Sequence, residues 1–259
     1  KEIIECCKEE GVLFISTPYN AEDVDFLEGL GVSAYKLASI HAVEPWLAKY
    51  TASKGKPIFL STGMATLGEV DETVRAIRET GNQDLILLQC TTNYPSRMED
   101  ANLRAMQTMA QAFDISVGYS DHTPDDIACI VSIGLGATVI EKHFTLDKSL
   151  PGPDQSTSSD PEEFLQLVKN IRNAEKVLGS SIKEPCEIEK INSHGMRRSI
   201  VAKCDIQAGT VISDAMLTFK RPASGLSPVF VEELIGKEAA EDIKADALIQ
   251  WSQVKNEAV

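Results

Sequence analysis

Residues 115–144 have the sequence ISVGYSDHTPDDIACIVSIGLGATVIEKHF, and two short apolar, β-branched runs lie in it, Ile115–Gly118 and Thr138–Glu141. The residues between these runs have the apolar periodicity of a helix. A strand, a helix and a second strand in this order predict a parallel pair joined by a right-handed crossover. The stretch therefore predicts an α/β fold.

The same alternation extends toward the N-terminus. Four more candidate strands precede this unit, namely Val12–Ser16, Ala34–Leu37, Pro57–Ser61 and Leu85–Gln89. Helix starts separate several of them, with N-caps at Asn20 and Thr66, and Asp160 followed by Pro161 opens a further helix after the last strand. The strands end near residues 16, 36, 61, 89, 118 and 141, in steps of 20, 25, 28, 29 and 23. Such steps are typical of a (β/α)₈ TIM barrel.

Six strands are fewer than a complete barrel has, so we expect a TIM barrel that lacks about its first two βα units. The opening residues, KEIIECCKEEG, have the pattern of the last turns of an amphipathic helix, which agrees with a missing N-terminal part. We expect residues 1–180 to form this partial barrel, 181–196 a polar linker, and 197–259 a small β-rich domain with strand-like runs RRSIVAK and ALIQW.

Composition excludes several classes of partner. The net charge of −14 argues against nucleic acid, which is bound by clustered Lys and Arg. No apolar run approaches the roughly 20 residues that cross a bilayer, so we expect no membrane partner. The six cysteines show no C-x-x-C spacing, which favours a reduced, cytoplasmic setting.

Two histidines follow the last two predicted strands. His122 and His143 are 143 − 122 = 21 residues apart, one βα step, so both should lie at one mouth of the barrel. Imidazole suits a divalent transition metal. From spacing alone, two hydrogen-bonded structural histidines remain an equal alternative.

Lys36 lies in an otherwise apolar strand, where a cation needs an anionic partner or a function. It could form a Schiff base, bind a phosphate or carboxylate, or extend its amine from the strand end to water. Four hydroxyls at strand ends could complete an anion pocket with it: Thr17, Ser39, Ser61 and Ser120. Taken singly, each could equally be a turn or capping residue.

Several motifs together resemble one family, the N-acetylneuraminate (sialic acid) synthases and their legionaminic acid relatives. The motifs, in chain order, are FISTPY, AYKLAS, LSTGMAT, TTNYP, GYSDHT, GLGATVIEKHFT, PGPD, RRSIVA and FKRP. The resemblance extends from about Gly11 to Trp251. Its C-terminal part resembles the antifreeze-protein-like SAF domain.

This resemblance implies an enzyme that condenses phosphoenolpyruvate with the open-chain aldehyde of N-acetylmannosamine or a related acylamino sugar, and releases phosphate. It implies a divalent metal at His122 and His143, usually Mn²⁺, with Mg²⁺ or Co²⁺ as alternatives. Lys36 and the four hydroxyls match phosphoenolpyruvate-binding positions. Tyr94 and Asp154 match positions near the sugar. Arg221 matches an arginine that reaches the partner's active site in a domain-swapped homodimer.

The chain also departs from the family pattern. His41 occupies a position that is usually glutamate, and Gln155 follows PGPD where histidine is common. The family's first strands supply a catalytic glutamate and a second phosphoenolpyruvate-binding lysine, so we expect little or no activity from this chain alone. Three hypotheses follow: a sialic acid-type synthase, including legionaminic or pseudaminic acid synthases; a Schiff-base aldolase using Lys36; and a non-catalytic sugar-binding fragment.

Overall fold

The computed structural model describes residues 1–255. The chain divides into two compact units between Gly179 and Ser180, next to the boundary expected at residue 180. Each unit is described by itself.

The first unit is built on a five-stranded parallel sheet in the order β1-β2-β3-β4-β5. Spatial order follows chain order, as in a barrel wall. The predicted parallel α/β architecture is therefore confirmed. The strands are β1 (Tyr35–Leu37), β2 (Ile58–Ser61), β3 (Leu85–Cys90), β4 (Val117–Asp121) and β5 (Ala137–Lys142).

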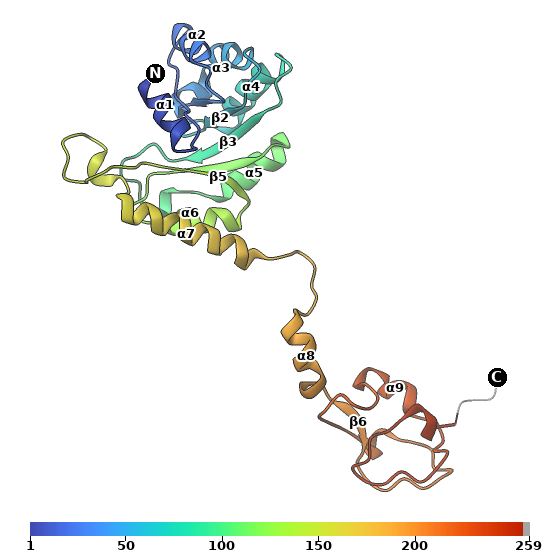
Figure 1. The fold of residues 1–259 in the computed structure, drawn as a ribbon. Helices are drawn as coiled ribbons and strands as arrows, with labels where there is room; N and C mark the ends of the chain where they lie inside the picture. Colours follow the sequence, from blue (N-terminus) through green and yellow to red (C-terminus); the bar gives the residue numbers. More distant parts are fainter. Residues whose placement is uncertain (256–259) are drawn as a thin grey trace. The chain divides into compact units, whose positions relative to one another are not determined.

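A helix follows each strand of this sheet, and two more precede it. Figure 1 shows α6 and α7 next to each other beside β5. The predicted starts of three helices are confirmed, since the side chains of Asn20, Thr66 and Asp160 accept hydrogen bonds from the first turns of α2, α4 and α7. The helices are α1 (Glu2–Glu9), α2 (Ala21–Leu30), α3 (Pro45–Ala52), α4 (Leu67–Arg78), α5 (Arg104–Phe113), α6 (Ile127–Gly134) and α7 (Pro161–Leu178).

The two faces of the sheet have different roles. Side chains such as Tyr35, Leu60 and Leu87 are fully buried in the core that the sheet forms with the helices. Because successive residues of a strand point to opposite faces, Lys36 and Ser61 project from the other face. Burial of the apolar face holds the sheet in register, and this register fixes the polar groups opposite.

Two predicted strands differ in the structure. Val12–Ser16 does not form a strand. Only Ser16 pairs with the neighbouring chain, in a single bridge with Tyr35 of β1. The strand predicted at Ile115–Gly118 instead continues to Asp121. The apolar pattern ends at Gly118, but the ladder continues through polar residues on both faces.

The second unit contains β6 (Ser199–Ala202) and β7 (Leu217–Lys220), paired antiparallel, and the short helix α9 (Val231–Leu234). Its core includes Ile200, Ile212 and Ile249. The segment ALIQW forms only one bridge, between Leu248 and Val201, rather than a strand. The expected linker 181–196 contains helix α8 (Glu187–Met196), whose N-cap is Cys186. In residues 1–255, no helix is both long and apolar enough to cross a membrane.

Candidate active site

Polar side chains converge at the carboxyl ends of the five parallel strands. In α/β folds of this type the loops after the strands form the site, because the carboxyl ends of parallel strands share one edge. Of the ten residues singled out from sequence, eight lie in or after these five strands, Thr17 precedes β1 in the same unit, and Arg221 follows β7 in the second unit.

Lys36 is the centre of a polar cluster on the inner face of the sheet. Its Nζ donates to Ser61 Oγ at 2.8 Å and to the Leu37 carbonyl oxygen at 2.9 Å. It also lies 3.6 Å from Glu141 Oε2, and Ser120 Oγ donates to Glu141 Oε1 at 2.6 Å. Residues from β1, β2, β4 and β5 therefore surround one point. We refer to Lys36, Ser61, Ser120 and Glu141 as the inner cluster.

Electrostatics at Lys36 reflect its burial. Removal from water lowers the pKa of Lys36 below its ordinary value, and the neighbouring Glu141 carboxylate opposes this only in part. A poorly hydrated ammonium gains more from an anionic ligand than an exposed one does. The position therefore suits a phosphate or carboxylate group.

Ser39 is held beside this cluster by a close backbone approach. The Gly63 amide donates to Ser39 Oγ at 3.1 Å. A Cβ atom on Gly63 would lie 2.4 Å from Thr92 Oγ1 and 2.8 Å from Ser39 Oγ, so only glycine fits at this position. The LSTGMAT segment thus brings the loop after β2 against the residues that follow β1 and β3.

His122 and His143 lie together at the ends of β4 and β5. Their ring centroids are 5.2 Å apart and the rings are nearly perpendicular. The Tyr94 ring contacts both, with centroids 4.1 Å from His122 and 5.5 Å from His143. The structure therefore brings together two histidines that lie 21 positions apart in sequence.

The histidine pair fits a divalent metal. His122 Nδ1 lies 2.8 Å from the Thr91 carbonyl oxygen, which can only accept, so in the tautomer that fits this contact Nδ1 carries the proton and Nε2 is left to bind a metal. Burial, with a smaller effect of His122, lowers the pKa of His143 and favours the neutral ring that binds metal. Within residues 1–255, no group of three or more His, Cys, Asp or Glu side chains is arranged to hold a metal. Two imidazoles would therefore be completed by oxygens of water or substrate.

The remaining sequence candidates occupy different places. Asp154 Oδ2 lies 3.8 Å from His143 Nδ1, which puts this carboxylate at the edge of the histidine pair. Thr17 follows the bridge at Ser16, beside β1, and is half-buried. Arg221 is exposed, and its Nε donates to the Met196 carbonyl oxygen at the end of α8.

Glu141 is a site residue that sequence reasoning did not select. Its position at a strand end was visible, but a glutamate there has no signal of its own in one sequence. The spacing of Ser120 and Glu141, 21 residues, equals that of the two histidines and places them opposite each other in the ladder. This equal spacing was the sequence signal from which Glu141 could have been selected.

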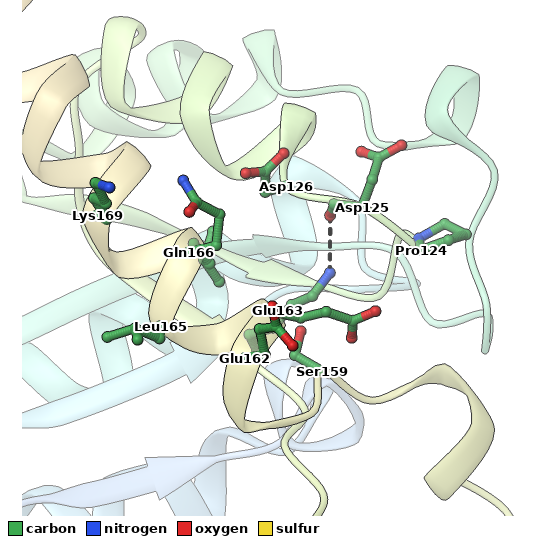
Figure 2. Close-up of a pocket in the computed structure, with 11 residues that line it drawn as sticks. Pro124, Asp125, Asp126, Ser159, Glu162, Glu163, Leu165, Gln166 and Lys169 are labelled. Carbon is green, nitrogen blue, oxygen red and sulfur yellow. Dashed lines mark hydrogen bonds between the residues drawn. The ribbon is translucent and has the colours of Figure 1, made fainter. Parts of the chain in front are cut away.

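A cavity of about 570 Å³ lies outside this site, between the β4–α6 loop and α7 (Figure 2). Its lining includes the carboxylates of Asp125, Asp126, Glu162 and Glu163. Lys142 also lines it, and strand alternation puts Lys142 on the opposite face from Glu141. An acidic cavity on the helix side of the sheet does not suit an anionic substrate, so the inner face is the better candidate.

Comparison with known proteins agrees with this arrangement. The first unit has a parallel sheet with polar strand ends, and the second unit is small and β-rich. The NeuB family model matches residues 1–183, and the SAF domain model matches residues 197–255. The chain therefore belongs to the NeuB family and ends in a SAF domain.

Named relatives narrow this class. The chain is 42% identical to the N,N'-diacetyllegionaminic acid synthase of Campylobacter jejuni, over 96% of this chain and 75% of that protein. It is 39% identical to the pseudaminic acid synthase of the same species, over 96% and 73%. The crystal structure of the N-acetylneuraminic acid synthetase from Leptospira borgpetersenii superposes with a TM-score of 0.70 at 31% identity, over 74% of this chain and 67% of that one. These relatives are all sialic acid-type synthases.

Proposed function

We propose that this chain carries the phosphoenolpyruvate- and metal-binding part of a sialic acid-type synthase. The reaction joins the enol carbon of phosphoenolpyruvate to the aldehyde carbon of an N-acetylmannosamine-type sugar, and water adds to the neighbouring carbon as phosphate leaves. The observation that carries the proposal is the convergence of the inner cluster and the two histidines at one end of the sheet.

The inner cluster supplies the anion site. Lys36 and the Ser61 hydroxyl would bind the phosphate or carboxylate of phosphoenolpyruvate, because Ser61 accepts from Lys36 and keeps its own proton to donate. Glu141 holds both Lys36 and Ser120 and so aims their side chains at one region. Ser39 and Thr17 are proposed to complete this site from neighbouring loops.

The histidine pair supplies the metal site. A divalent ion, Mn²⁺ in this proposal, would act as a Lewis acid toward the sugar aldehyde when it is bound. His122 and His143 would hold it, while Tyr94 covers both rings and would contact the sugar. Asp154, exposed beside His143, would accept hydrogen bonds from sugar hydroxyls.

The acceptor and the assembly are further parts of this proposal. The acceptor is an acylamino sugar of the N-acetylmannosamine type, and the legionaminic and pseudaminic relatives support sugars with additional acylamino groups. In a domain-swapped homodimer, the exposed Arg221 of one subunit would reach the sugar site of the other. Sedimentation of the chain and of Arg221→Ala, with sugar affinity measured on both, tests this arrangement.

The test of the reaction is phosphate release from phosphoenolpyruvate with Mn²⁺ and a panel of acylamino sugars. It compares this chain with a form extended by two N-terminal βα units, since the resemblance assigns a glutamate and a lysine to that region. Release that requires sugar, metal and both histidines supports the synthase. A folded, extended protein that binds sugars without releasing phosphate would favour the sugar-binding role, and His41 would be the first residue to exchange.

A Schiff-base aldolase is a second candidate because burial lowers the pKa of Lys36, which increases the fraction of neutral, nucleophilic amine. Against it, Lys36 Nζ is already engaged by two oxygens and by Glu141. Borohydride reduction in the presence of pyruvate, followed by mass spectrometry, separates the two. A covalent adduct on Lys36 would support the aldolase.

A further inference from the structure

The two residues that precede His122 and His143 in the chain form a buried ion pair. Lys142 Nζ is 2.6 Å from Asp121 Oδ2, and the side chains are 4% and 0% exposed. Asp121 is the last residue of β4 and Lys142 the last of β5, and they are opposite each other in the ladder. Each immediately precedes a histidine, His122 or His143.

The pair lies on the helix side of the sheet, whereas the histidines face the inner side. Ser120 and Glu141 bond to each other on the inner face, so alternation turns the next residues, Asp121 and Lys142, toward the helices. The Cys129 thiol of α6 donates to Asp121 Oδ2 at 3.2 Å, which agrees with this direction.

Both members of the pair have several partners. Lys142 Nζ also donates to the Thr123 carbonyl oxygen at 2.6 Å and to the Asp125 carbonyl oxygen at 3.1 Å, so its three protons are used. Asp121 Oδ1 accepts from the Thr123 amide at 2.8 Å. His122 therefore lies between two residues, Asp121 and Thr123, that are tied to the residue preceding His143.

Stability alone does not explain this arrangement. Removing two charges from water costs several kcal/mol per ion, and well-packed apolar replacements of buried ion pairs are often neutral or stabilising. An ion pair with directed hydrogen bonds fixes geometry more narrowly than apolar packing does. Because each member of the pair immediately precedes a histidine, the geometry that the pair can fix is that of the His122 and His143 rings.

We propose that Asp121 and Lys142 are positioning residues that set the spacing and direction of the His122 and His143 rings for a shared divalent metal. This inference rests on the metal site of the proposed function. Outer partners of this kind typically change metal affinity by 10- to 100-fold when they are lost.

The test replaces both charges at once, in Asp121→Leu/Lys142→Met, so that no unpaired charge stays buried. Mn²⁺ affinity is measured by titration calorimetry, and thermal stability by unfolding. We expect Mn²⁺ binding about 10- to 100-fold weaker, with a Tm equal to or above that of the unchanged chain. Lys49→Met/Glu79→Leu, which removes an exposed ion pair between α3 and the end of α4, should change neither quantity.

Unchanged Mn²⁺ affinity in a folded double variant would overturn the proposal. If that variant does not fold, Lys142→Arg keeps the charge but alters the length and the hydrogen-bond pattern. Weaker Mn²⁺ binding by folded Lys142→Arg supports positioning, and unchanged binding contradicts it. His122→Ala and His143→Ala are measured in parallel: if these variants keep Mn²⁺ affinity, the metal site itself is wrong, which is a different failure.

Discussion

Lys36 Nζ on β1 lies 3.6 Å from Glu141 Oε2 on β5, although β1 and β5 are the two outer strands of the five-stranded sheet. In a flat sheet these strands would be about 19 Å apart, at about 4.8 Å per step. The side chains of Lys36 and Glu141 are too short to meet across that distance. The sheet is therefore strongly curved, and its concave face is the one that carries the inner cluster.

Lys36→Met should weaken phosphoenolpyruvate binding by about 10- to 100-fold, since a charged hydrogen bond contributes about 1.5–3 kcal/mol. The variant should not lose thermal stability, because it removes a buried cation and leaves Glu141 with access to water. Calorimetric titration and thermal unfolding measure the two effects. Lys49→Met, an exposed lysine, is the matched control and should bind normally.

The lowered pKa of Lys36 predicts a pH dependence with a definite sign. Between the lowered pKa of the folded chain and the ordinary value of 10.5, the unfolded chain binds more protons, so stability rises with pH in this window. Phosphoenolpyruvate affinity should fall over the same window, because the ammonium is lost. Urea unfolding at several alkaline pH values tests this. If the rise of stability with pH persists unchanged in Lys36→Met, Lys36 is not the group that causes it.

Gly63→Ala should destabilise the chain and weaken phosphoenolpyruvate binding together. The new Cβ would overlap Thr92 Oγ1 and Ser39 Oγ and displace the loop after β2. We expect a loss of about 1–3 kcal/mol, as for other overpacked positions. Gly68→Ala in α4 is the control, because its Cβ meets nothing within 4 Å and alanine favours a helix. Equal behaviour of the two variants would count against a steric requirement at Gly63.

Two variants of Tyr94 should separate the ring from the hydroxyl. Tyr94→Phe keeps the contacts with His122 and His143, so Mn²⁺ affinity should stay the same. If the hydroxyl contacts the sugar, KM for the acceptor should rise by about 5- to 10-fold in an active, extended form. Tyr94→Ala should lower Mn²⁺ affinity as well. A Phe variant with weakened metal binding would show that the hydroxyl acts on the metal site instead.

His41→Phe should cost no more than about 1 kcal/mol, although His41 is 1% exposed. Among the described side chains, its Nε2 is a buried atom without a hydrogen-bond partner, and Nδ1 bonds to Glu44, which is half-exposed and can return to water. Phenylalanine keeps the edge-on contact with Tyr19. His41→Ala should cost about 2–4 kcal/mol by leaving a cavity. Chemical unfolding of both variants checks the difference.

The sequence predicted the repeating βα architecture because apolar strands and capped helices alternate regularly. It also located Lys36, His122 and His143, since polar residues at strand ends share one edge in this fold. It failed where pairing does not follow the apolar pattern, as in Val12–Ser16 and in the polar end of β4. The 3.6 Å contact between Lys36 and Glu141 could not be foreseen, because a predicted barrel implies a curved sheet but does not say which side chains meet across its concave face.

The alternation of faces at the ends of β4 and β5 also constrains how this protein can change. Ser120, Asp121 and His122 are consecutive, yet the roles proposed for them are ligand binding, support of the histidines and metal binding, in turn. An insertion or deletion of one residue here would turn these side chains to the opposite faces of the sheet. These segments should therefore tolerate substitution better than any change of length. New acceptor preferences are therefore expected to evolve in the loops beyond the strands, where length is free to vary.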